Sequence, residues 1–269
     1  MRRELNGLRA IVTGASRGIG RLTAERLAEK GVAVLLAARS VEALETVAKG
    51  IADKGGSAVA CPADLTTPEG RESVVSAAER ELGGLDVLVN NAGVAAWGHF
   101  ATSNEALLRT VLETNFFAPA ELIRTAYRLL KDGKKPIVVN VASLCGKHGM
   151  PAWPEHSASK SALVGLTESL HCEFVRFGID VSLVVPGLTR SHDLSKHLLR
   201  KDGKAELNFE NATPPEKVAE AIVEAVRSGR RQTLVGRDTR MLLLAHKLFP
   251  RLVDRMIAKK VTKLYTTTK

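Results

Sequence analysis

The stretch RAIVTGASRGIG, residues 9–20, decides the fold of this chain. It begins as a short apolar run of the kind that forms a buried strand, and it ends in TGASRGIG, which is rich in glycine. A helical pattern, IGRLTAERLAEKG, follows and ends at Gly31. Glycines between a strand and a helix permit a tight turn, and they let a diphosphate approach the backbone at the helix N-terminus. The stretch therefore predicts a dinucleotide-binding strand, turn and helix at the start of the chain.

The rest of the chain repeats this alternation of apolar runs and helical patterns. Six further strand candidates are VAVLLAA, SAVACPADL, LDVLVNNAG, PIVVNVAS, IDVSLVVPG and QTLVG. Helical patterns are expected near 41–54, 67–83, 103–131, 156–177 and 214–228. Continuous apolar strands separated by helices predict a parallel sheet that is covered on both faces. The expected fold class is α/β, with one doubly wound Rossmann domain over residues 1–236 and a seven-stranded, mostly parallel sheet.

Composition is that of an ordinary globular protein, with 45% hydrophobic and 25% charged residues. Three cysteines, Cys61, Cys145 and Cys172, are odd in number and widely spaced, so no disulfide or metal-site spacing is evident. No signal peptide is recognised at the N-terminus, and no stretch reaches about 18 uninterrupted apolar residues. We expect a cytoplasmic protein, and no metal site.

Charge is concentrated at the C-terminal end. Residues 230–269 contain eleven Lys or Arg against two acids, which gives +9 of the net charge of +10. A nearly neutral body argues against nucleic acid as a partner. Residues 237–269 are expected to form a basic amphipathic helical extension with two apolar stripes broken by Pro250. Such a segment is typical of peripheral contact with an anionic membrane; the alternative is a helix that packs over the substrate cleft or a partner subunit.

Two arginines and a missing acid bear on the choice of cofactor. An acid at the end of the second strand would bind the ribose hydroxyls of NAD. In LLAARS this place is taken by Ala38, Arg39 follows, and Arg17 lies inside the glycine loop. Two guanidinium groups without a carboxylate suit the 2′-phosphate of NADP(H). The alternative is that Arg39 is merely a solvated residue after a strand.

From about residue 6 to 236 the chain resembles the short-chain dehydrogenase/reductase family. TGASRGIG resembles that family's nucleotide loop, ADL (63–65) its adenine segment, and NNAG (90–93) its motif after the fourth strand. PG at 186–187, followed by Thr189 and Ser191, resembles the segment beside the nicotinamide. The resemblance implies these cofactor-binding residues: Gly14, Ser16, Arg17, Gly18, Ile19, Gly20, Arg39, Asp64, Leu65, Asn91, Ala92, Gly93, Lys160, Pro186, Gly187 and Thr189.

The resemblance also implies a catalytic set of Asn115, Ser143 and Lys160, with one departure. Ser143 precedes position 156 by thirteen residues and Lys160 follows it by four, which is the family's spacing of serine, tyrosine and lysine. The residue at this position is His156 instead of the tyrosine that the family uses as proton donor and acceptor.

His156 can take the proton role if its imidazole stays neutral. His156 and Lys160 lie one helical turn apart, so they are neighbours. A free imidazole has a pKa of about 6.5, and a nearby cation lowers it. A neutral imidazole is a competent base for alcohol oxidation and a poor acid for carbonyl reduction. We therefore expect an NADP(H)-dependent oxidoreductase that interconverts a carbonyl and a secondary alcohol, with His156, or a water that it holds, in the proton role.

Two alternatives stay open. One is a weakened enzyme in which hydride transfer survives on Ser143, Lys160 and cofactor geometry. The other is a silent NADPH-binding protein that acts as a sensor or a partner-binding module.

The segments that would bind substrate are rich in large apolar residues. Trp97, Phe100, Met150 and Trp153 favour a hydrophobic ketone or alcohol, although they could instead pack against each other or a subunit neighbour. The family resemblance implies a homodimer or homotetramer. Nearby, Cys145 is interpreted as an apolar wall, and His148 and His192 as surface-loop histidines.

Overall fold

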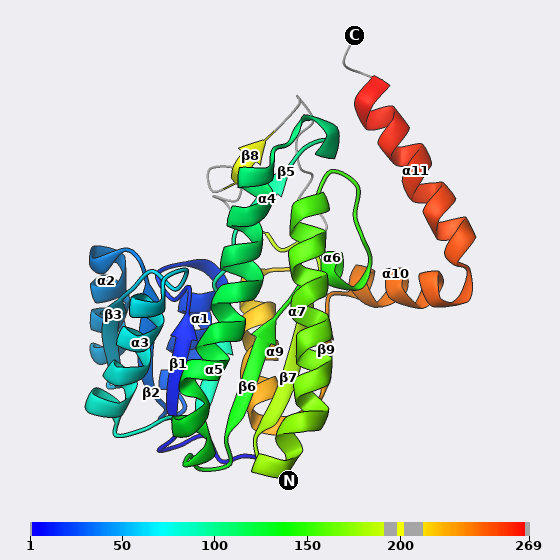
Figure 1. Cartoon of the computed structure of the whole chain (residues 1–269). Coiled ribbons are helices and arrows are strands. Elements are labelled where there is room, and N and C mark those ends of the chain that lie inside the picture. Colours follow the sequence, from blue (N-terminus) through cyan, green and yellow to red (C-terminus); the bar gives the residue numbers. More distant parts are fainter. Residues whose placement is uncertain (1, 191–197, 202–211, 267–269) are drawn as a thin grey trace.

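The structure is a computed structural model that describes residues 2–190, 198–201 and 212–266. Figure 1 shows a central sheet between two layers of helices, and a pair of helices that leaves this body at the C-terminal end.

Seven parallel strands form the central sheet in the order β3-β2-β1-β4-β6-β7-β9. Their bounds are β1 (Arg9–Thr13), β2 (Ala33–Ala38), β3 (Ala58–Pro62), β4 (Val87–Asn90), β6 (Ile137–Val141), β7 (Asp180–Pro186) and β9 (Gln232–Val235). Every residue of β4 and β6 is buried, because helices cover both faces of a parallel sheet. The predicted doubly wound α/β fold with seven strands is confirmed.

Helices cover both faces of the sheet (Figure 1). One face carries α1 (Gly18–Ala28), α2 (Val41–Ala52) and α9 (Pro215–Ser228), and the other carries α3 (Pro68–Ala77), α5 (Ala118–Lys131) and α7 (Pro154–Glu173). The first core joins Leu27, Leu44 and Ile222 to the strands, and the second joins Val74 and Leu122. The sheet is thus sealed on both sides, and only its strand ends remain for a binding site.

The helical pattern expected over 103–131 is three elements rather than one. It contains α4 (Glu105–Leu112), a π-helical turn η3 (Glu113–Phe117) and α5. The proline at position 119 lacks an N–H and cannot donate to the carbonyl of Asn115, four residues earlier. The regular α-helical hydrogen-bond pattern is interrupted here, and a π-helical turn takes its place. The pattern near 67–83 similarly ends in a π-helical turn, η1 (Ala78–Leu82).

Several short elements were not predicted. They are the two-stranded parallel sheet of β5 (Ala95–Trp97) and β8 (Leu198–Lys201), the helix α6 (Leu144–Lys147) and the 3₁₀ turn η2 (Phe100–Thr102). Each has at most four residues, which is too short for periodicity to give a clear signal. The helical pattern predicted to end near 177 finishes in a 3₁₀ turn, η4 (Phe174–Phe177).

The C-terminal extension consists of α10 (Arg237–Leu248) and α11 (Pro250–Thr266). The chain breaks between them at Pro250, as the sequence predicted. Figure 1 shows α10 leaving the domain and α11, in red, standing apart from the sheet. Among the residues that the structure describes, no helix is both long enough and apolar enough to span a bilayer.

Candidate active site

The fold has one place where the chain reverses its progress across the sheet. From β1 the strands proceed outward to β2 and β3, whereas β4, on the other side of β1, leads to β6, β7 and β9. In open α/β sheets, ligands bind in the crevice outside the carboxyl ends of such a strand pair. The glycine loop leaves β1 and residues 91–94 leave β4. Thr13 joins the two, since its Oγ1 accepts hydrogen bonds from the N–H groups of Asn91 (2.9 Å) and Ala92 (3.0 Å).

A cleft with a volume of about 460 Å³ lies at this crevice. Eleven of the predicted cofactor residues line it: Gly14, Ser16, Arg17, Gly18, Ile19, Arg39, Asp64, Leu65, Asn91, Ala92 and Gly93. Five others, Gly20, Lys160, Pro186, Gly187 and Thr189, are absent from its lining. The wall also includes Thr110, Thr114 and Leu199, which the sequence did not single out. These three come from α4, η3 and β8, so only the tertiary fold brings them to the cleft.

Two glycines let the loop pack closely enough to present backbone to a ligand. A Cβ at Gly14 (φ +65°) would lie 2.9 Å from Ala92 Cα, and a Cβ at Gly20 would lie 2.2 Å from the carbonyl oxygen of Gly14. No side chain caps the start of α1, whose N-cap is Arg17. The first N–H groups of a helix without a side-chain cap are available to an anion. The loop therefore fits a diphosphate.

The rest of the cleft also fits a dinucleotide. Arg17 and Arg39 are exposed, and no hydrogen bond or ion pair joins either guanidinium group to the residues that the structure describes. Asp64 Oδ1 accepts hydrogen bonds from the N–H and the hydroxyl of Thr66, and these bonds, helped by Arg39, lower the pKa of the Asp64 carboxyl. The buried Asn90 Oδ1 finds no hydrogen-bond partner among the described residues. Asn90 is one of the residues that line the cleft.

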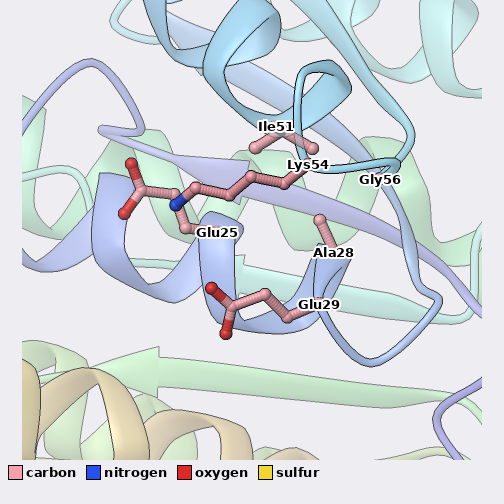
Figure 2. A pocket seen from close by; sticks show the side chains of 6 residues that line it. All are labelled: Glu25, Ala28, Glu29, Ile51, Lys54 and Gly56. Atoms are coloured by element: carbon pink, nitrogen blue, oxygen red, sulfur yellow. The ribbon is translucent and has the colours of Figure 1, made fainter.

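A second, much smaller pocket lies between α1 and α2. Figure 2 shows its six lining residues, with the Lys54 side chain extended across α1 toward Glu25. Its volume of about 20 Å³ is enough for one water molecule. This pocket lies at the C-terminal end of α1, whereas the glycine loop precedes the N-terminus of that helix. It is therefore not part of the cleft.

Lys160 is held at the end of β6. Its side chain is buried, and Nζ donates a hydrogen bond of 2.9 Å to the carbonyl oxygen of Val141, the last residue of that strand. Burial lowers the pKa of Lys160 to about 8. The ammonium is thus still charged at neutral pH, and its hydrogen bond fixes it between α7, to which Lys160 belongs, and the end of β6.

His156 is held at the end of the neighbouring strand. Its half-buried ring lies with Nδ1 3.3 Å from the carbonyl oxygen of Val94. Burial, and secondly the charge of Lys160, lower the pKa of His156 to about 4, against a smaller opposing effect of the Val94 carbonyl. A carbonyl oxygen can only accept, so this contact assigns the proton of the neutral ring to Nδ1 and leaves the lone pair on Nε2. His156 is therefore a neutral base at physiological pH.

Asn115 orders the segment that holds His156. Its amide is buried in η3, where Oδ1 accepts from Val94 N (2.8 Å) and Nδ2 donates to Val94 O (2.9 Å) and to Ser159 Oγ (3.0 Å). Val94 O is consequently shared between Asn115 and His156. A Cβ at Gly93 would lie 3.0 Å from Asn115 Oδ1 and 3.5 Å from Lys160 Nζ, so the backbone at Gly93 lies beside both groups.

Ser143 begins the segment after β6. It caps α6, and its half-buried Oγ accepts a hydrogen bond from Cys145 N at 3.2 Å. It lies two residues beyond Val141, the carbonyl that holds Lys160. Ser143 therefore follows β6 directly, whereas Asn115 in η3 and His156 and Lys160 in α7 reach the ends of β4 and β6 through hydrogen bonds to Val94 and Val141. The two strands are paired in the sheet. Burial raises the pKa of the Cys145 thiol, which agrees with an apolar wall rather than a nucleophile.

Residues that hold this site were missed in the sequence because they act through the backbone. Val94 and Val141 contribute carbonyl oxygens, which no side-chain motif reveals. Ser159 contributes a hydroxyl that accepts from Asn115 and donates to the carbonyl of His156 (2.9 Å). Its place one residue before Lys160, in SASK, is the only sequence signal for this role.

The segment after β7 does not line the cleft in the part that the structure describes. Gly187 N donates to Val235 O (3.2 Å), and Thr189 pairs with Thr213. Ser191 and His192 lie outside the described residues.

The four apolar residues predicted to bind substrate differ in how exposed their side chains are. Trp97 is buried in β5, Phe100 is 64% exposed, and Met150 and Trp153 are half-buried. None of the four lines the cleft at the ends of β1 and β4. The ring of Trp153 lies beside that of His156, with centroids 6.0 Å apart.

Comparison with known proteins gives one consistent result. The family described as short chain dehydrogenase matches residues 9–203. Ketoacyl reductase HetN of Nostoc sp. is 30% identical over 258 residues, which cover 94% of this chain and 88% of the relative. The 3-oxoacyl-acyl-carrier-protein reductase FabG of Vibrio cholerae is 34% identical over 196 residues, which cover 72% of this chain and 78% of the relative.

The fold is similar to that of a short chain dehydrogenase/reductase from Burkholderia phymatum, whose crystal structure is in complex with NAD. That structure has a TM-score of 0.84 and 23% identity, and the match covers 93% of this chain and 96% of the other. At this identity the likeness concerns the fold alone.

Proposed function

This chain belongs to the short-chain dehydrogenase family, and from that premise we propose that it is an NADP(H)-dependent oxidoreductase acting on a hydrophobic carbonyl and the corresponding secondary alcohol. Its relatives are ketoacyl reductases and other oxidoreductases, which supports a general oxidoreductase role. The preference for NADP(H), the substrate class and the role of His156 are our proposals and go beyond this general role.

Residues on both sides of the cleft would hold the cofactor. The loop at Gly14–Gly20 would bind the diphosphate, and Asp64 and Leu65 would line the adenine site. Arg17 and Arg39, whose exposed guanidinium groups form no hydrogen bond or ion pair with the described residues, would bind the 2′-phosphate. When bound, the nicotinamide supplies the carbon that accepts or gives up a hydride.

His156 would move the proton. In alcohol oxidation, the carbinol carbon gives up a hydride while the hydroxyl proton passes to Nε2 of His156, directly or through one water. Ser143 would hold the substrate oxygen, as in the family that the chain belongs to. The fixed Lys160 ammonium opposes the imidazolium that forms, so the proton is released quickly to water.

The observation that carries this proposal is the hydrogen bond between His156 Nδ1 and Val94 O. It orients the ring and leaves Nε2 as acceptor. With a pKa of about 4, only about one His156 in a thousand is protonated at pH 7. The arrangement thus favours oxidation near neutral pH, whereas reduction needs the rare imidazolium.

The experiment is turnover of a panel of hydrophobic secondary alcohols with NADP⁺, and of ketones with NADPH, by the unmodified chain. We expect alcohol oxidation to exceed ketone reduction at neutral pH, and Ser143→Ala to reduce both. The proposal is wrong if NADPH binds but nothing turns over while His156→Tyr restores reduction. That result would favour a silent NADPH-binding protein.

A further inference from the structure

Three metal-binding side chains meet outside the cleft, near the turn between α10 and α11. His148 follows α6, His246 lies in the last turn of α10, and Asp254 lies in α11. One ligand atom of each lies within 4.8 Å of the other two. The two imidazole rings have centroids 4.4 Å apart, and His246 Nε2 lies 3.8 Å from Asp254 Oδ1.

The chemistry of this cluster suits Zn²⁺. Two imidazole nitrogens and one carboxylate oxygen are a common zinc ligand set, with a water as the fourth ligand. Bonds of about 2.0–2.1 Å at tetrahedral angles place ligand atoms about 3.4 Å apart. The separation between His246 and Asp254 is already near this value. His148 and His246 are half-buried and Asp254 is exposed, so side-chain rotation can close the remainder.

Charge around the cluster does not oppose a cation. Lys147, the residue next to His148, has its ammonium paired with Glu168. The side chain of Lys247 is exposed and can extend into solvent. Asp254 supplies one negative charge directly to the site. A divalent ion would therefore meet one carboxylate and two imidazole rings.

We propose that His148, His246 and Asp254 bind one Zn²⁺ ion per chain, which fastens the C-terminal extension to the segment that follows Ser143. The sequence predicted no metal site because His148 is about 100 residues from His246 and Asp254, and the three follow no ligand spacing. The proposal goes beyond the oxidoreductase function and does not depend on it, because the ion would join two parts of the chain outside the cleft.

The test is Zn²⁺ binding by the full chain after treatment with a chelator, measured by titration calorimetry with zinc chloride. We expect one ion per chain. His148→Gln, His246→Gln and Asp254→Asn should each weaken binding by at least about tenfold, since loss of even an outer partner of a ligand costs about 10–100-fold. His99→Gln, at an exposed histidine before η2, is the matched control and should bind as the unmodified chain does.

A second readout concerns the fastening itself. Zn²⁺ should slow tryptic cleavage at Arg251 and Arg255, which are exposed in α11, in the unmodified chain and in His99→Gln but not in the ligand variants. Circular dichroism without metal should show all variants folded. Absence of zinc binding, or binding that all three ligand variants retain, would overturn the site. Binding that leaves cleavage unchanged would overturn the fastening.

An independent feature of the extension is an apolar surface without a described covering. Six large apolar residues of the extension are more than half exposed: Met241, Leu244 and Leu248 in α10, Phe249 between the two helices, and Leu252 and Met256 in α11. The three in α10 lie at i, i+3 and i+7, and the two in α11 are four residues apart, so each helix presents its own on one face. Residues 237–259 also contain six Lys or Arg against two acids. An apolar face among basic residues is the pattern of a helix that lies on anionic lipid.

We infer that this surface binds an anionic membrane. A symmetric contact between two copies would place the same excess of positive charge on both sides, whereas an anionic bilayer complements it. We expect the chain to cosediment with vesicles containing phosphatidylserine, to remain free of pure phosphatidylcholine vesicles, and to be released by high salt. Phe249→Ser combined with Leu252→Ser should abolish binding, while Val175→Ser, at an exposed valine of η4, should not.

Two results would overturn the membrane inference. One is absence of binding to anionic vesicles. The other is a dimer in solution that the double variant converts to monomer, which would assign the surface to a second copy of the chain.

Discussion

The two sides of the candidate site are built in different ways. On the nucleotide side, close backbone packing at Gly14 and Gly20 shapes the floor of the cleft. On the proton side, Lys160 and His156 are each held by one backbone carbonyl, of Val141 and Val94. The nucleotide side depends on glycines, which have no side chain. The proton side depends on the burial and the hydrogen bonds of the Lys160 and His156 side chains. A change in chemistry at position 156 is therefore compatible with an unchanged nucleotide side.

The largest effect is expected from His156→Ala. Removal of a general base typically costs about 10²–10⁴ in rate, so alcohol oxidation should fall by that factor. NADPH binding, measured by fluorescence titration, should stay the same, because His156 does not line the cleft. If His156→Ala lost NADPH binding as well as alcohol oxidation, the nucleotide side and the proton side would not be independent.

Gly20→Ala should instead disturb the nucleotide side and weaken NADPH binding. Its Cβ would meet the carbonyl oxygen of Gly14 at 2.2 Å, so the loop backbone must move. Overpacking of this kind costs about 1–3 kcal/mol, and we expect thermal unfolding at a lower temperature together with weaker NADPH binding. Unchanged binding would contradict the close packing described for this loop.

Arg39→Gln tests the cofactor preference within the nucleotide side. Loss of one charge-assisted contact at an exposed position should weaken NADPH binding by about tenfold, near the low end of the range for charged groups. NADH binding should not change. Arg109→Gln, at an exposed arginine of α4 that pairs with Glu105, is the control. An equal loss for both cofactors would argue against binding of the 2′-phosphate by Arg39.

The smallest effect is expected from Gly50→Ala in α2. A Cβ there would meet nothing within 4 Å, and the residue lies inside a helix. The substitution should raise the free energy of unfolding by about 0.5–1 kcal/mol, because alanine loses less backbone entropy in a helix. Chemical denaturation measures this change. Gly50 has space for a Cβ and Gly20 has none, so a destabilised Gly50→Ala variant would contradict the explanation given for Gly20.

The nucleotide side could be predicted from sequence because its signals are local. Glycines between an apolar run and a helical pattern identify the loop, and eleven of the predicted residues line the cleft. The seven strands could be predicted for the same reason, as continuous apolar runs. The π-helical turn at Asn115 could not, since it follows from a missing N–H at position 119 and from tertiary contact with Val94.

The proton side could be predicted only in part. Helical spacing placed His156 beside Lys160, and the expected lowering of the histidine pKa has the direction found in the structure. The larger cause is burial, which spacing does not reveal. The bond to Val94 O, which fixes the tautomer, and the cluster of His148 with His246 and Asp254 both join segments far apart in the chain.

The most direct test of the central claim is the pH dependence of alcohol oxidation and ketone reduction, compared with His156→Gln. His156 is neutral above its lowered pKa of about 4, so oxidation should hold a plateau from about pH 5 upward. The rate of alcohol oxidation should change a second time near pH 8, where Lys160 loses its proton. Reduction should rise as the pH falls toward 4. Both acid limbs should disappear in His156→Gln; if they persist there, or if oxidation falls already near the ordinary imidazole pKa, His156 is not a neutral base with a lowered pKa.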